Sequence, residues 1–116
     1  METDLVNVQL RLEKSMIEEI AGYAGDEFPE VNRWMVQAVS DFLRQPMQEN
    51  LETPIITRLG ERDEKTRRNI RFSLGLLEDI DRRVSRLNKN YDLALTRTQW
   101  IIAALRTQIE VERESK

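Results

Sequence analysis

Two stretches of the chain, sixty residues apart, alternate strictly between apolar and polar side chains. The first, V-N-V-Q-L-R-L at residues 6–12, has valine or leucine at every second position and Asn, Gln or Arg between them. The second, R-R-N-I-R-F at residues 67–72, has Ile70 and Phe72 as its apolar positions. Because successive side chains of a strand point to opposite faces, each stretch predicts a short strand with one apolar and one polar face.

Directly after the first strand, the spacing of apolar residues changes from two to three or four. This helical spacing predicts a helix over residues 13–24, and Gly25 is the type of residue that commonly ends one. A second helix is predicted over residues 33–44, with Asn32 as its N-cap. Pro46 then prevents its continuation, because proline has no backbone N–H to donate within a helix.

The second half of the chain repeats the first. The segment L-L-E-D-I at residues 76–80 aligns with M-I-E-E-I at residues 16–20, at an offset of sixty that continues without a gap back through the strand. A longer second loop raises the offset to sixty-six, so that Trp100 aligns with Trp34. Both tryptophans are expected to pack between helices.

This repeat predicts two further helices. One is expected over residues 74–87, with Ser73 as its N-cap and N-K-N at residues 88–90 ending it. The other is expected over residues 99–112, with Thr98 as its N-cap. The order strand, helix, loop, helix therefore occurs twice.

The chain divides into a first repeat at residues 1–44, a connector at residues 45–66 and a second repeat at residues 67–116. One strand alone leaves both of its edges unpaired, so a single repeat cannot close a core. We therefore expect a mainly α fold, one pseudo-dimeric domain in which two strands form an antiparallel ribbon backed by four helices. The connector can span ~70 Å when extended, so the repeats can pair within one chain or between two chains.

The connector is not a flexible glycine–serine linker, because it contains several apolar residues and a proline. We expect a short helical turn near residues 46–52, followed by irregular chain. The apolar side chains of residues 45–66 either pack on the outside of the core or form a surface for a protein partner.

Histidine and cysteine are absent from the 116 residues. Most zinc sites and most general-base catalysis use one of these residue types, so we expect no catalytic residues, no metal, no cofactor and no enzyme. The N-terminal sequence M-E-T-D-L has neither a basic flank nor an apolar segment, and no apolar run approaches ~18 residues. A cytoplasmic protein without a membrane partner is expected.

The net charge of -3 is distributed unevenly along the chain. Residues 1–44 have 4 basic and 9 acidic side chains, whereas residues 61–116 have 13 basic and 10 acidic ones. Residues 65–71 alone have four basic side chains and no acidic one. A local basic stripe can bind phosphate although the global charge is negative, so the second repeat is the better candidate for binding a polyanion.

The first repeat reads V-N-V-Q-L-R-L-E-K-S-M-I-E-E-I and then N-R-W-M-V-Q-A-V-S-D-F-L, and the second reads N-I-R-F-S-L-G-L-L-E-D-I-D and then T-R-T-Q-W-I-I-A-A-L. Both resemble the ribbon-helix-helix family of DNA-binding proteins, the fold of the Arc and MetJ repressors. Family members usually have one copy per chain and dimerise. Two copies resemble the tandem members, such as the relaxosome accessory proteins of conjugative plasmids. The resemblance covers about 80 of the 116 residues and implies double-stranded DNA as the partner.

The polar face of the predicted ribbon fits the chemistry of base recognition. A two-stranded ribbon fits the major groove of B-DNA, where side-chain amides pair with adenine and arginine pairs with guanine. The outward positions of both strands have only these residue types. The alternative interpretation is the solvated outer face of an ordinary antiparallel ribbon. The candidates for base contact are Asn7, Gln9, Arg11, Arg67, Asn69 and Arg71.

The family resemblance further implies phosphate contacts at the N-terminus of each second helix, where free N–H groups and the helix dipole favour an anion. Basic residues beside the second strand are also expected to contact the DNA backbone, and Arg68 falls on the inward face, where the ribbon is expected to end. Glu13, Asp26 and Glu30 lie near these positions, so it stays open whether the first repeat contacts DNA. The candidates for phosphate contact are Asn32, Arg33, Lys65, Arg68, Arg97, Thr98 and Gln99.

These features predict a sequence-specific DNA-binding protein, and transcriptional repression by occupying an operator is the favoured role. A plasmid relaxosome or partition accessory role would use the same contacts. An antitoxin-like protein-interaction module, with the connector as its binding surface, is the alternative from another class. A homo-oligomer on DNA is compatible with each role, and the sequence specifies neither the target site nor the regulated gene.

Overall fold

The two alternating stretches form an antiparallel ribbon within one chain. A computed structural model describes residues 5–46 and 65–115, and strand β1 is Leu5–Glu13 while strand β2 is Lys65–Ser73. Each strand is longer than the alternation predicts, because both continue up to the first residue of the following helix. The two repeats therefore pair with each other inside the chain, which is one of the two arrangements that the connector length allows.

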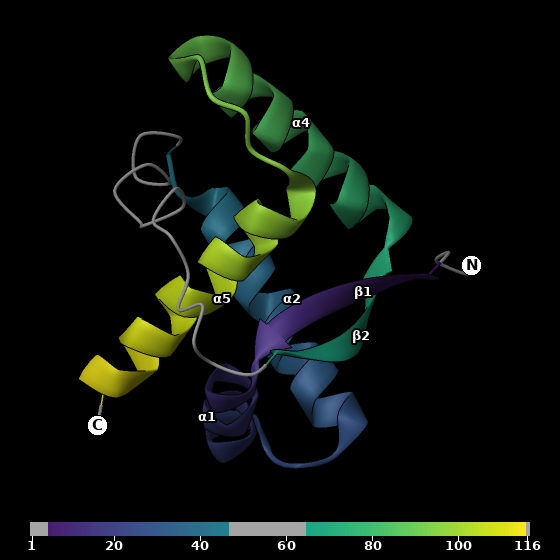
Figure 1. The fold of residues 1–116 in the computed structure, drawn as a ribbon, viewed down its shortest axis with the longest axis vertical. Coiled ribbons are helices and arrows are strands. Elements are labelled where there is room, and N and C mark those ends of the chain that lie inside the picture. Colours follow the sequence, from purple (N-terminus) through teal and green to yellow (C-terminus); the bar gives the residue numbers. More distant parts are fainter. Residues whose placement is uncertain (1–4, 47–64, 116) are drawn as a thin grey trace.

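Each strand leads directly into a helix, and a second helix follows after a loop (Figure 1). Because the strands are antiparallel, their two following helices leave from opposite ends of the ribbon. The described residues thus form a mainly helical fold with a two-stranded antiparallel sheet and four helices, as expected. Most of the predicted connector at residues 45–66, and with it most of the predicted helical turn, lies outside the described residues. The helices are α1 (Lys14–Ala24), α2 (Phe28–Arg44), α4 (Leu74–Tyr91) and α5 (Arg97–Glu114).

Helix α2 begins earlier than the sequence predicts, so the prediction that Asn32 is its N-cap is wrong. The N-cap is Glu27, which has extended backbone angles (φ -85, ψ 147) and no capping hydrogen bond from its side chain. Pro29 lies in the first turn, where its missing N–H costs nothing and its fixed φ favours a helix. Pro29, which lies before the predicted start of this helix, therefore belongs to its first turn, and Asn32 lies one turn inside the helix.

The N-cap of α5 is Thr96, so the prediction for Thr98 is also wrong. The Thr96 hydroxyl accepts a hydrogen bond from the Gln99 N–H at 3.1 Å, and the Gln99 side chain accepts one from the Thr96 N–H at 2.9 Å. This reciprocal pair is a capping box, which satisfies two of the N–H groups at the helix start. Thr98 is the second residue of the helix and is exposed.

Helix α4 continues through residues 88–90, which were expected to end it. Its C-cap is Asp92, whose φ of 56 is left-handed. Asn88 remains helical because its side chain bonds the returning loop, where it donates to the Leu95 carbonyl at 3.0 Å and accepts from the Leu95 N–H at 2.8 Å. The predicted N-cap of α4 is confirmed, since the Ser73 hydroxyl accepts from the Leu76 N–H at 3.2 Å.

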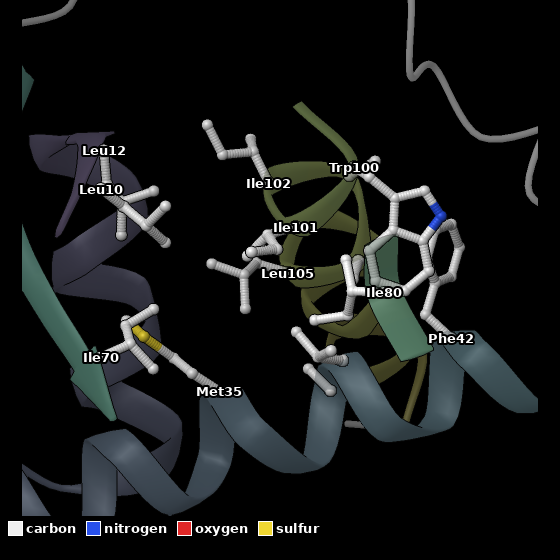
Figure 2. Packing of buried hydrophobic residues seen from close by; sticks show 14 of the residues in the cluster. Leu10, Leu12, Met35, Phe42, Ile70, Ile80, Trp100, Ile101, Ile102 and Leu105 are labelled. Atoms are coloured by element: carbon white, nitrogen blue, oxygen red, sulfur yellow. The ribbon is translucent and has the colours of Figure 1, made fainter. Parts of the chain in front are cut away.

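Many core residues occupy matching positions in the two repeats, and Figure 2 shows several of them meeting between the ribbon and the helices. Trp100 is fully buried, with its ring 5.1 Å from that of Phe42, as expected for packing between helices. Trp34 lies at the edge of the core, and its indole N–H donates to the Glu112 carboxylate at 3.0 Å. The matched buried positions are Leu10 and Ile70, Leu12 and Phe72, Ile20 and Ile80, Met35 and Ile101, Ala38 and Ala104, and Val39 and Leu105.

Candidate nucleic-acid interface

The polar face of the ribbon is exposed along its length, while its apolar face is buried against the helices. Leu10, Ile70 and Phe72 are 0% exposed, which anchors the inward face and leaves the alternate positions outward. A shift of the register by one residue would turn these side chains to solvent, so the burial fixes which face is outward. The register places the six outward residues in three cross-strand rows, namely Asn7 with Arg71, Gln9 with Asn69, and Arg11 with Arg67.

The backbone of Arg71 shows how closely the side chains in these rows approach one another. Its N–H donates to the Asn32 Oδ1 at 2.7 Å, and its carbonyl accepts from the Asn32 Nδ2 at 3.2 Å. Both groups therefore point away from β1, so Asn7 and Arg71 form a non-hydrogen-bonded pair. Because pair types alternate along an antiparallel ladder, all three outward rows are of this type, in which opposite Cα atoms lie about 4.5 Å apart.

The register and the sequence repeat share one centre. The offset of sixty relates Gln9 to Asn69, and these two residues also lie opposite each other in the ribbon. An approximate two-fold axis therefore passes between them. The axis also relates two further pairs of outward residues. In one pair both residues are arginine, and in the other an amide of the first repeat corresponds to an arginine of the second. These pairs are Arg11 with Arg71 and Asn7 with Arg67.

The ribbon face has positive charge that none of the ion pairs among the described residues neutralises. Arg11 and Arg67 lie directly opposite each other, and like charges in such a pair destabilise a sheet. Within residues 5–46 and 65–115, none of the described ion pairs includes Arg11, Arg67 or Arg71. A ligand that presents hydrogen-bond acceptors or negative charge to this face would relieve the repulsion.

A cleft of 350 Å³ separates the start of α2 from β2. It brings Asn32 and Arg68, two candidates for phosphate contact, together with two candidates for base contact. The register places Arg68 on the inward face opposite Leu10, as predicted, but the strand continues to Lys65 and the ribbon does not end there. The residues that line the cleft are Asp26, Phe28, Val31, Asn32, Met35, Arg67, Arg68 and Asn69.

The start of α2 has few groups suited to a phosphate. The amide of Asn32 is used by the backbone of Arg71, and Arg33 is exposed one residue further along the helix. Three exposed carboxylates surround this helix end, and they would repel an anion. They belong to Asp26, Glu27 and Glu30.

The start of α5 is free of acidic residues in its first turn, but its polar side chains are engaged. Arg97 binds the carboxylate of Asp81 on α4 through two hydrogen bonds of 2.9 and 3.0 Å, which raise the pKa of Arg97 above its ordinary value. The side chain of Gln99 belongs to the capping box, whereas Thr98 is exposed. None of these three residues lines the cleft beside β2.

The acidic residue expected next to the DNA is engaged by another part of the fold. Glu13 forms an ion pair of 3.0 Å with Arg106 of α5, and the Glu13 side chain is only 13% exposed. Its charge is therefore largely compensated at this end of the ribbon. The backbone of Lys65 lies opposite Glu13, and the side chain of Lys65 lies outside the described parts of the structure.

One residue of the site has no counterpart among the sequence predictions. The guanidinium of Arg71 lies over the ring of Phe28, 5.5 Å from its centroid, and the Phe28 side chain is 45% exposed. An exposed aromatic residue directly before Pro29 is the signal that could have identified it, but its neighbour on β2 is forty-three residues away in sequence.

Comparison of the chain with protein-family models, with curated proteins and with solved structures gave no match. Among the described residues, no cluster of acidic side chains is arranged to hold a metal ion. None of the helices in the described ranges is both long enough and apolar enough to cross a membrane.

Proposed function

We propose that this chain is a sequence-specific DNA-binding protein of the ribbon-helix-helix type, which places its ribbon in the major groove. We further propose that it regulates transcription by occupying an operator. The observation that carries this proposal is the arrangement of the outward face in three close cross-strand rows of amide and guanidinium groups, without a carboxylate.

The amide and guanidinium groups of these rows are suited to hydrogen bonding with base edges, and not only to attracting phosphate. The major groove is about 12 Å wide and admits a two-stranded ribbon. An amide can donate to and accept from adenine, and arginine can donate twice to guanine, with each such pair worth about 1–3 kcal/mol of discrimination. A surface that only attracts phosphate would not need the amides of Gln9 and Asn69 at its centre.

The symmetry of the ribbon predicts the form of the target site. The approximate two-fold axis between Gln9 and Asn69 predicts two inverted half-sites. The half-sites should differ where Asn7 of one repeat corresponds to Arg67 of the other, because the first favours adenine and the second favours guanine. The proposed target is therefore an imperfect inverted repeat.

Selection of bound duplexes from a random pool tests this function. We expect the wild-type protein to enrich one imperfect inverted site, with a binding constant that falls steeply with salt. With about 4–6 phosphate contacts, the slope of log K against log salt should be roughly -4 to -5. Selection of no site, together with binding that does not respond to salt, would contradict the proposal.

Two arginine variants separate base recognition from attraction to phosphate. Arg71→Ala should lose the preference for the selected site over random DNA, because it removes an outward guanidinium from the ribbon. Arg68→Ala should weaken binding to all duplexes similarly. The matched control is Arg86→Ala, which removes an exposed arginine of α4 outside the ribbon and should leave both affinities unchanged. Equal losses in all three variants would indicate a general effect of charge.

A further inference from the structure

The side chain of Asn32 covers the open edge of β2 at a single residue. It accepts from the Arg71 N–H at 2.7 Å and donates to the Arg71 carbonyl at 3.2 Å. An amide that pairs with both backbone groups of one residue takes the place of a neighbouring strand, since it satisfies the outward donor and acceptor together. The backbone that presents the Arg71 side chain is thereby fixed to α2.

Phe28 contacts the guanidinium group of Arg71. The guanidinium carbon of Arg71 lies 5.5 Å from the centroid of the Phe28 ring, within the ~6 Å range of a cation–π contact. Pro29 in the first turn of α2 restricts the backbone that positions this ring. Arg71 is therefore held at its backbone by Asn32 and at its charged group by Phe28, both from α2.

Among the described residues, none gives such support to Arg11, the related position in the other repeat. At the offset of sixty-six, Thr98 corresponds to Asn32 and Ala94 corresponds to Phe28. Alanine has no ring, and within the described residues no hydrogen bond joins Thr98 to Arg11. Arg11 and Arg71 are thus equivalent in the ribbon but differ in how firmly the fold holds them.

We propose that Asn32 and Phe28 are positioning residues that hold Arg71 for base recognition, so that the half-site under Arg71 is read more strictly than the half-site under Arg11. This inference rests on the proposed function, since it concerns the same ribbon face. A long side chain that is ordered before binding loses less conformational freedom when it binds. Asn32 therefore acts through Arg71 and does not itself contact a phosphate.

Asn88 offers a matched control for the loss of the Asn32 amide. Its side chain makes the same two kinds of hydrogen bond to the backbone of one residue, Leu95, in the loop between α4 and α5. Asn32→Ala should reduce discrimination at the base pair read by Arg71 about tenfold, in binding measured on the selected duplex and its point mutants. Asn88→Ala should leave discrimination at every position unchanged.

Phe28→Leu tests the second contact, because leucine keeps an apolar side chain but has no ring for the cation. We expect it to reduce discrimination at the same base pair by about two- to fivefold and to change no other position. A uniform loss of affinity on all duplexes in Asn32→Ala would instead identify Asn32 as a phosphate contact and would overturn the inference.

Hydrogen exchange in the free protein tests the positioning without DNA. The Arg71 amide should lose protection in Asn32→Ala and keep it in Asn88→Ala, since only the first variant removes its acceptor. Equal protection in both variants overturns the inference. If the wild-type protein selects a site and Asn32→Ala retains full discrimination, the inference fails while the proposed function stands. If the wild-type protein selects no site, both fail.

Discussion

Ion pairs between residues more than ninety positions apart connect α5 to the first repeat. Glu19 of α1 binds the guanidinium of Arg113 through two hydrogen bonds of 2.6 and 2.7 Å, and it accepts a third from the Tyr23 hydroxyl at 2.9 Å. The bonds from Arg113 lower the pKa of Glu19, although partial burial acts in the opposite direction. The partner of Glu19 could not be identified from the sequence, because Arg113 is 94 residues away on another helix.

This pairing predicts a dependence of stability on pH. Because the pKa of Glu19 is lower in the folded protein than its ordinary value of 4.5, its contribution to stability is complete above that value and is lost as the pH falls through the lowered pKa. Thermal unfolding between pH 6 and pH 3, read by circular dichroism, should show a smaller decrease in midpoint for Glu19→Gln than for wild type. Glu18→Gln, which changes an exposed neighbour, should behave as wild type. Identical curves for all three proteins would contradict the account.

The sequence predicts which candidate site residues face outward, but it does not predict the contacts that these residues make. The alternation of residues 6–12 and 67–72 was sufficient to predict which side chains face outward, because the period of a strand is two. It could not predict that Asn32 bonds the backbone of Arg71, since that contact depends on where α2 crosses the ribbon. Phe28 was missed for the same reason.

The ends of the helices depend both on local sequence patterns and on contacts with residues further along the chain. The capping box T-R-T-Q at residues 96–99 is a local pattern, and it was misread by two residues because both threonines are suitable caps. Helix α4 passes through residues 88–90 because the side chain of Asn88 bonds Leu95, a contact that only the folded loop provides. Local preference for a turn is therefore overridden where the loop returns onto the helix.

The two threonines give a direct test of the observed cap. Thr96→Ala should destabilise the protein by about 1 kcal/mol, because it leaves the Gln99 N–H without its acceptor. This corresponds to a decrease in Tm of roughly 4 °C for a domain of this size, measured by calorimetry. Thr98→Ala should shift stability by less than about 0.5 kcal/mol, because Thr98 is exposed within the helix. A larger effect at Thr98 than at Thr96 would contradict the assignment of the cap.

For the molecule as a whole, the two repeats build one core within one chain. The matched positions of both repeats contribute to a single apolar cluster, as Figure 2 shows for residues from the ribbon and three helices. Sequence reasoning could predict this core from the repeat, but it could not decide between pairing within and between chains, because the connector is long enough for either. In the structure, the register pairs the two strands within one chain.

Pairing within the chain predicts the solution state. The free protein should sediment as a monomer at micromolar concentration, because each strand already has its partner. Analytical ultracentrifugation, without and with a duplex that contains one selected site, should give one chain alone and one chain per site. A stable dimer in the absence of DNA would indicate that strands pair between chains.

The most direct test of the central claim, that the outer face of the ribbon binds DNA, is a nuclear magnetic resonance titration of the labelled protein with the selected duplex. The largest changes in amide shifts should lie in the three outward rows, centred on Gln9 and Asn69, while amides around Arg86 on the exposed face of α4 should not change. Changes centred on α4 with an unaffected ribbon would contradict the account.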